Sequence, residues 1–442
     1  MAKLTAEKEL SKTSIEVGMR AFTSLAKEID SELEVVFDPT EKVGSSGTVK
    51  DFAEYFRDRF EKLSRILRQR LDAKDATSIK NALKASLNER VKIIAMVLEK
   101  RESKNKIFLQ IDDIESSATL LASPETGKTS KVFETAQRIP LDQVLCVEAI
   151  RGRGDLFIAE KLVLPDIPER RIPLADKPVQ AVLLSDIHVG SKTFLEKTFS
   201  KLILWLNGKV GNSNQVEIAS QVKYVVIAGD LVDGVGVYPH QDEDLIVDDV
   251  YGQYRLAAKY LEQIPDYIEV VLAPGNHDPV RQALPQPAVA KEYAEPVYEA
   301  REIVSVGNPA ELKLHGVHLL VYHGRSLDDI IATVPNMSFD TPQEAMKFQL
   351  KCRHLAPEYG KRTSIAPERK DYLVVEHPPD VFQSGHIHVA KHDSYRGTLV
   401  VNCGTWQAQT EYQKKMGLKP TPGILPVLNL QTMQIRMIDF GY

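Results

Sequence analysis

Residues of metal-binding type recur along the C-terminal half of the chain, each time directly after a short apolar run. Asp186 and His188 follow the run that ends at Leu184, and Asp230 follows the run that ends at Ala228. Three further apolar runs are followed, in order, by an Asn-His-Asp triplet, a single His and a His pair: Asn276, His277 and Asp278; His323; His386 and His388. Carboxylate and amide oxygens combined with imidazole nitrogens, without a thiolate, suit Mn²⁺, Fe²⁺ or Zn²⁺.

This set of donors is too large for one metal ion that keeps open coordination positions. Two ions about 3.5–4 Å apart, bridged by a carboxylate, would use the whole set. We interpret Asp230 as the bridge because it stands alone at its strand end. Such a pair of ions polarises a phosphate ester and generates a hydroxide nucleophile at neutral pH. The sequence therefore predicts hydrolysis of a phosphoester.

The apolar runs before these residues predict the strands that must position them. Short apolar runs bounded by polar residues are typical of buried strands, and open α/β sheets bind ligands at the carboxyl ends of their strands. The runs span residues 179–184, 224–228, 268–273, 317–322 and 381–383. Segments 194–207 and 251–264 between them are expected to be covering helices. We therefore predict an α/β domain over residues 178–442.

Five shorter strands are predicted before this domain, at 91–98, 107–111, 118–122, 143–150 and 156–162. Residues 102–106 between the first two are polar and predict a hairpin turn. Five strands in so short a segment suit a Greek-key barrel of the OB type, here over residues 86–177. Binding of single strands by such a barrel needs exposed aromatic and basic residues. The strands carry few aromatics besides Phe108 and Phe157, so packing against another subunit is favoured over DNA binding.

Residues 1–85 are predicted to form a short helical region with a linker near residues 38–48. The stretch up to about residue 38 has one apolar helical face, formed by Ile15, Met19, Phe22, Leu25 and Ile29. Thr48 and Asp51 then indicate a second helix start. Its aromatic and apolar stripe is expected to be core or a partner-docking face rather than a base-stacking platform: Phe52, Phe56, Phe60, Leu63 and Leu67. The charged stretch 57–70 is expected to be its solvated side.

Composition limits the class of protein. The 442 residues, 43% apolar and 26% charged, predict two or three globular domains, α+β overall. We expect no membrane segment, no signal peptide and, because the three cysteines lie far apart, no disulfide framework. A cytoplasmic protein fits. The net charge of −5 does not indicate a free-standing duplex binder, although a nuclease with a metal-filled cleft, or a subunit whose partner carries the basic channel, fits it.

The ordered motifs Asp-x-His, Gly-Asp, Gly-Asn-His-Asp, His-Gly and Gly-His-x-His resemble the signature of the calcineurin-like metallophosphoesterases, over about residues 180–405. The resemblance implies a β-sandwich flanked by helices, with two metal ions in its cleft. The implied ligands of the first ion are Asp186, His188, Asp230 and His388, and those of the second are Asp230, Asn276, His323 and His386. His277 is implied to stabilise the transition state or protonate the leaving group, and Asp278 is expected to orient it by a hydrogen bond.

A closer resemblance rests on the stretches 233–239, 322–329 and 402–410 together with the preceding barrel. Residues 88–440 resemble the small subunits of archaeal family D DNA polymerases, which are related to the B-subunits of eukaryotic replicative polymerases. This resemblance implies a proofreading 3′→5′ exonuclease acting on single-stranded or mismatched DNA ends. Mn²⁺ is the implied metal, with Mg²⁺, Fe²⁺ or Zn²⁺ as alternatives. The implied partner is a separate large polymerase subunit, and a sliding clamp is a further candidate.

Two other functions stay open at this point. The first is a metallophosphoesterase for another substrate, and the second is a catalytically inactive scaffold subunit. The intact set of ligand positions speaks against the scaffold. Arg281 and Arg325 each follow a metal motif, so each is a candidate contact for a DNA phosphate or a member of a structural ion pair. Trp406 fits base stacking or the core, and His354 fits capping or packing better than substrate contact.

Overall fold

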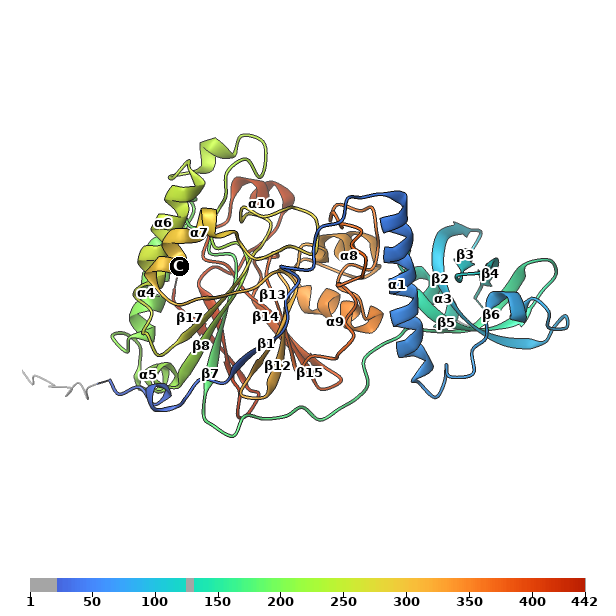
Figure 1. Ribbon diagram of the computed structural model, residues 1–442, viewed down its shortest axis with the longest axis horizontal. Coiled ribbons are helices and arrows are strands. Elements are labelled where there is room, and N and C mark those ends of the chain that lie inside the picture. The colour runs from blue at the N-terminus through green and yellow to red at the C-terminus, as the bar shows by residue number, and fades with distance from the viewer. Residues whose placement is uncertain (1–21, 125–130, 442) are drawn as a thin grey trace, which may run out of the picture.

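The computed structural model describes residues 22–124 and 131–441. Figure 1 shows a large body built on two β-sheets, a smaller β-barrel beside it, and the long helix α1 between the two. The predicted mixture of helices and strands, with a barrel in front of an α/β body, is confirmed. The domain boundaries proposed above stay a prediction. Within the described ranges, no helix has the length and apolar character needed to cross a bilayer.

The first sheet carries the first three predicted strand ends. Its strands run in the order β10-β9-β8-β7-β16-β17. Their bounds are β7 Gln180–Leu184, β8 Val222–Ala228, β9 Glu269–Ala273, β10 Val304–Ser305, β16 Ile424–Asn429 and β17 Ile435–Asp439. The pairs β7–β8, β8–β9 and β9–β10 are parallel. The carboxyl ends of β7, β8 and β9 therefore lie along one edge.

The second sheet carries the last two strand ends. Its strands run in the order β1-β11-β12-β13-β15-β14. Their bounds are β1 Leu33–Phe37, β11 Ala310–Leu314, β12 Val317–Val321, β13 Val381–Ser384, β14 Lys391–Tyr395 and β15 Thr398–Asn402. The neighbours β12 and β13 are parallel, so their carboxyl ends also share an edge.

The two sheets pack face to face. One buried cluster joins residues of the first sheet, such as Leu183 and Val226, to residues of the second, such as Leu312 and Val381. Helices cover both outer faces, as Figure 1 shows. Over the first sheet lie α4 Glu196–Leu206, α5 Ser213–Ser220, α6 Val250–Leu261 and α7 Lys291–Ala300, and over the second lie α8 Leu327–Thr333 and α9 Pro342–Cys352. The helices predicted at 194–207 and 251–264 are confirmed as α4 and α6.

The barrel closes with the strand order β2-β3-β4-β6-β5. Its strands are β2 Arg90–Ser103, β3 Lys106–Asp112, β4 Ser117–Ala122, β5 Val144–Arg151 and β6 Leu156–Val163, which confirms all five predicted strands. Lys104 and Asn105 form the predicted turn, both with positive φ, as a type I′ hairpin turn requires. Two short helices, α2 Ile79–Ala82 and α3 Lys131–Arg138, were not predicted, and both contribute to the barrel core.

The prediction that the chain is helical up to about residue 38 is wrong for the described part. After the single-turn 3₁₀ helix η1 at Ala26–Glu28, the segment Leu33–Phe37 forms β1 and pairs antiparallel with β11. The β-branched pair Val35 and Val36 favours a strand, and the sheet edge supplies the backbone hydrogen bonds. Ile15 and Met19 lie outside the described residues.

Helix α1, Val49–Arg68, begins at the predicted cap: Thr48 and Asp51 exchange side-chain and backbone hydrogen bonds. The predicted linker before it contains no helix or strand from 38 to 48. The aromatic and apolar stripe of α1 packs within the molecule, in agreement with the first of its two predicted roles, core or partner-docking face. Phe52 and Phe56 contact the ring of Tyr359, and Leu63 and Leu67 pack with barrel residues. Helix α1 therefore joins the barrel to the sandwich.

The charged side of α1 is not simply solvated, contrary to expectation. Arg59 is fully buried, and its Nε donates to Asp371 Oδ2 at 2.7 Å. The rest of its guanidinium donates to the carbonyl of Pro357 and the hydroxyl of Tyr55. His354 Nε2 lies 2.8 Å from the same Asp371 oxygen. A buried charge persists only when it is paired and hydrogen-bonded, and here the pair connects α1 to the sandwich.

Candidate metal centre

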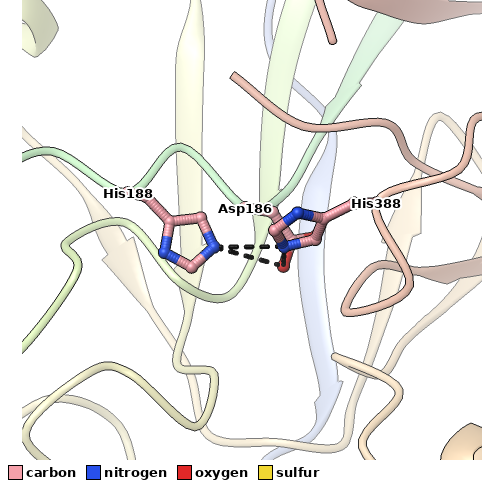
Figure 2. A group of neighbouring side chains, drawn as sticks. All are labelled: Asp186, His188 and His388. Atoms are coloured by element: carbon pink, nitrogen blue, oxygen red, sulfur yellow. Dashed lines mark hydrogen bonds and ion pairs between the residues drawn. The ribbon is translucent and has the colours of Figure 1, made fainter. Parts of the chain in front are cut away.

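Three side chains from two strand ends meet at one point of the sandwich. Asp186 and His188 follow β7, and His388 follows β13 (Figure 2). His388 Nε2 lies 3.3 Å from Asp186 Oδ1 and 3.2 Å from His188 Nε2. His188 Nε2 lies 3.9 Å from Asp186 Oδ1. The three donor atoms fall within 4.8 Å of one another, a spacing that one metal ion can bridge.

A second group of donors shares a carboxylate with the first. His323 Nε2, after β12, lies 3.2 Å from Asp230 Oδ2 and 3.0 Å from Asn276 Oδ1. The same Asp230 oxygen lies 3.9 Å from His188 Nε2 of the first group. Asp230, after β8, therefore stands between the two groups, where a bridging ligand would stand.

The remaining predicted ligand, His386, lies beside these groups. Its ring centroid is 5.3 Å from that of His323, and its backbone N–H donates to Asp186 Oδ2 at 2.9 Å. Its Nε2 faces Asp328 Oδ2 at 3.0 Å. The structure thus brings six of the seven predicted ligands together by their donor atoms and places the seventh at the edge of the second group.

The backbone at this site is held in a sparsely populated conformation. Five of the predicted ligands have φ between 53° and 68°, in the left-handed region: Asp186, His188, Asp230, His386 and His388. Among residues with a Cβ, this region favours Asn, Asp and His, and strained backbone of this kind gathers at functional sites. The backbone at Gly275 packs so closely against Asp230 that a Cβ there would lie 2.1 Å from Asp230 Oδ1.

The donor set fits divalent cations. Asp186 Oδ1 is buried and has no hydrogen-bond partner among the described residues, and such an atom needs a positive charge or a donor. Burial raises the pKa of Asp186, yet His388 and His323 outweigh it and hold the pKa at about 2. Burial lowers the pKa of His188, yet the carboxylates of Asp233, Asp230 and Asp186 outweigh it and raise the pKa to about 9. Positive charge therefore stabilises the carboxylates of the site, and a divalent cation would supply it.

Asp233 is a site residue that the sequence reasoning missed. Its Oδ1 lies 2.9 Å from His188 Nδ1 and 3.2 Å from Gln407 Nε2, and its Oδ2 lies 3.1 Å from Gln241 Nε2. A carboxylate on Nδ1 fixes the tautomer in which Nε2 is free to ligate a metal. The available signal was its place three residues after Asp230, in the stretch 233–239 that carried the closer resemblance.

His277 and Asp278 lie at the site, but the expected hydrogen bond between them is wrong. Asp278 accepts from the backbone N–H groups of Asp230 and Gly275 and from the hydroxyl of Tyr254, which occupies both carboxylate oxygens. Burial, and then Asp230, raise the pKa of Asp278 to about 6. The His277 ring is held instead by the carbonyl of Asp233, 2.7 Å from Nδ1. Burial lowers the pKa of His277 from its usual value, which disfavours the imidazolium in the free site.

The other singled-out residues have structural partners. Arg281 donates to Glu368 Oε1 at 2.7 Å and to the carbonyl of Pro285. It therefore forms a structural ion pair, one of the two roles predicted for it. Arg325 is half-buried and donates to Gln282. Trp406 is buried against Phe199 in the core under α4, so it does not present its ring to a base.

Comparison with known proteins first shows similarity to a class of DNA polymerase subunits. The family model that describes the B-subunits of DNA polymerases alpha and epsilon matches residues 181–391, which contain all the strand ends described above. A solved structure titled as a novel archaeal phosphodiesterase covers 59% of this chain and 99% of its own, at 15% identity. Its TM-score of 0.29 is too low to support an argument.

Longer relatives then define the particular family. The DNA polymerase II small subunit of Archaeoglobus fulgidus is 44% identical over 92% of this chain and 81% of its own length. The proteins of that name from Pyrococcus horikoshii and Methanocaldococcus jannaschii are 39% and 40% identical, each over 68% of its own length. The chain belongs to the family of archaeal DNA polymerase II small subunits, the small subunits of family D.

Proposed function

We propose that this chain is the small subunit of an archaeal replicative DNA polymerase and carries its proofreading activity. Its metal centre would hydrolyse phosphodiesters at the 3′ ends of single-stranded or mismatched DNA. One observation supports hydrolysis above the others: donor atoms from four strand ends gather beside the buried Asp186, whose Oδ1 makes no hydrogen bond among the described residues. An inactive scaffold has no need to keep such a carboxylate.

Two divalent cations are the proposed cofactor, with Mn²⁺ as the first choice. Asp186, His188 and His388 would hold one ion, Asn276 and His323 the other, with Asp230 between them; His386 would complete the second set. When bound, such a pair polarises a phosphoryl oxygen and supplies a nucleophile at neutral pH. The carboxyl ends of the parallel strands hold six of these donors together before substrate arrives, so little reorganisation of those six is needed during the reaction.

The chain itself orients the ligands and moves a proton. Asp233 holds His188 through Nδ1, so that Nε2 faces the cleft. The carbonyl of Asp233 accepts from Nδ1 of His277, so Nε2 of His277 is the nitrogen that takes up a proton from water and passes it to the leaving 3′-oxygen. Asp278 acts indirectly. Its carboxylate accepts hydrogen bonds from the backbone N–H groups of Asp230 and Gly275 and so fixes the turns that carry the ligands.

The proposed main partner is the large catalytic subunit. We place its docking surface on the barrel, which we assign to the OB type, and on the nearby outer face of the sandwich, because the cleft must stay open to DNA. Arg281 and Arg325 remain proposed phosphate contacts; Arg281 would first have to leave Glu368.

The test is a time course on 5′-end-labelled single-stranded and mismatched primer–template DNA with Mn²⁺, run beside a phosphoprotein substrate. Wild type should shorten the DNA and release little phosphate from the phosphoprotein. Asp230→Asn should retain its circular dichroism spectrum but lose both hydrolysis and metal, because it removes the shared ligand without touching the core. A wild-type chain that holds no stoichiometric metal and cuts no DNA would favour the scaffold.

A further inference from the structure

A short helix after the last strand of the second sheet is attached directly to the metal centre. Helix α10, Glu411–Met416, begins at Thr410, whose backbone N–H donates to Gln413 Oε1 at 3.0 Å within a capping box. The Nε2 atom of the same Gln413 lies 3.0 Å from Nδ1 of His388. Gln413 therefore holds α10 against a predicted metal ligand, so the helix lies beside the metal centre. In Figure 1, α10 lies at the top of the sandwich, away from the barrel.

The outer surface of α10 is aromatic and basic. Tyr412 is 65% exposed and Met416 is 57% exposed, although both are large apolar side chains. Lys414, Lys415 and Lys419 are exposed beside them, and Glu411 is the one acidic residue between 410 and 419. Exposed rings interleaved with lysines are the features that bind single-stranded nucleic acid, since bases stack on the rings and phosphates pair with the lysines.

A second segment reaches the same centre with the opposite charge. Gln241 donates to the carbonyl and to Oδ2 of Asp233, which holds His188, and it starts the 3₁₀ helix η2, Gln241–Asp244. Residues 241–249 contain five acidic side chains and no basic one. A polyanionic strand that approaches the cleft is therefore repelled by this segment and attracted by α10.

We propose that α10 is the surface that receives the single-stranded substrate. Tyr412 stacks on a base of the strand, and Lys415 and Lys419 pair with phosphates next to the bond that is cut. Gln413 links this surface to His388, which sets the distance between the held nucleotides and the metal centre. The proposal rests on the phosphodiesterase function proposed above and adds the substrate surface of that site.

Binding of a labelled phosphorothioate oligothymidylate to the full chain, measured by fluorescence anisotropy with Mn²⁺, tests this surface without requiring hydrolysis. The double variant Lys415→Glu/Lys419→Glu should raise Kd at least about tenfold and reduce the slope of log K against log salt by about 1.4, the value for two phosphate contacts to a single strand. The matched control Lys209→Glu/Lys259→Glu makes the same change of charge on the helical layer over the first sheet. Equal effects of the two double variants would overturn the proposal.

Variants of Tyr412 provide a second, independent test of the surface. Tyr412→Ala should weaken binding about tenfold, in the range found when a stacking ring is removed, whereas Tyr412→Phe should bind as wild type does because the ring remains. Equal binding by Tyr412→Ala and wild type would contradict stacking. The Tyr412 side chain is exposed, so neither change disturbs the core.

A small substrate separates failure of the surface from failure of the proposed activity. Bis(p-nitrophenyl) phosphate carries a single phosphate and no base, so it lacks the groups that Tyr412, Lys415 and Lys419 would hold. The α10 variants should hydrolyse it at the wild-type rate while their KM for the oligonucleotide rises. If wild type cleaves neither substrate but binds the strand through α10, the exonuclease is refuted and the surface stands. If wild type cleaves both and the α10 variants bind DNA normally, the surface is refuted.

Discussion

Replacing Asp233 by Asn tests whether the metal centre depends on the residue that orients His188. The Asp233 carboxylate accepts three hydrogen bonds: from His188 and Gln407 at Oδ1 and from Gln241 at Oδ2. Asparagine has the same shape but only one accepting atom. Its NH₂ group must therefore face either Gln241 or the pair formed by His188 and Gln407, and donors then oppose each other.

If the NH₂ group faces His188, the ring is driven to the tautomer that carries its proton on Nε2, the atom that must ligate. Loss of such an orienting partner typically lowers metal affinity about 10- to 100-fold, which is about 1.4–2.7 kcal/mol. We expect a loss of this size for one of the two Mn²⁺ ions, measured by isothermal titration calorimetry, with the circular dichroism spectrum unchanged.

Asp242→Asn is the matched control. It removes one negative charge from the same region, but its exposed side chain makes no described contact with a ligand. If the effect is one of orientation, this variant should bind both ions with nearly wild-type affinity. Equal losses in Asp233→Asn and Asp242→Asn would show that net charge alone is responsible, and unchanged affinity in Asp233→Asn would refute the role of the hydrogen bond.

Three further outcomes are expected. His277→Ala should lower single-turnover DNA cleavage by a factor on the order of 10²–10⁴, as expected for loss of a general acid or base, while both ions stay bound; loss of an ion would make it a ligand. Arg59→Met should cost about 3–5 kcal/mol of unfolding free energy, because Asp371 stays buried without its partner; urea denaturation measures this, and a cost below about 1 kcal/mol would contradict it. Burial, and then Arg59, lower the pKa of His354 to about 4, so from about pH 6.5 down to 4 the unfolded chain binds a proton that the native chain does not. Stability should fall in that window by about 1–3 kcal/mol, and His354→Gln should flatten the dependence; equal slopes would refute this source.

The sequence was most informative where one short pattern contains both the strand and its ligand. Asp186 and Asp230 follow short, β-branched apolar runs that favour a buried strand, so their meeting at one edge follows from the topology of parallel sheets. Asp233 gave a weaker signal, because its contact with His188 depends on how the loop after β8 folds back. The contact between Asp233 and His188 is tertiary, so no local sequence pattern predicts it.

Two errors have the same origin. Arg59 lies in a charged stretch that by composition belongs in water, and only the opposing Asp371, far along the chain, makes its burial stable. The strand β1 follows a helical spacing of apolar residues, yet the open edge of β11 offers it backbone hydrogen bonds that decide the outcome. In both cases the deciding partner lies hundreds of residues away.

The left-handed backbone at Asp186, His188, Asp230, His386 and His388 restricts how these positions can change during evolution. A β-branched or bulky residue is strained there whether or not a metal is bound, whereas Gly has no Cβ to clash and Asn adopts this region more readily than most residues. A descendant that no longer needed the ions would lose the requirement for a donor but keep the requirement of the turn. Its substitutions should therefore collect in Gly and Asn, and the cleft would keep its shape after losing its chemistry.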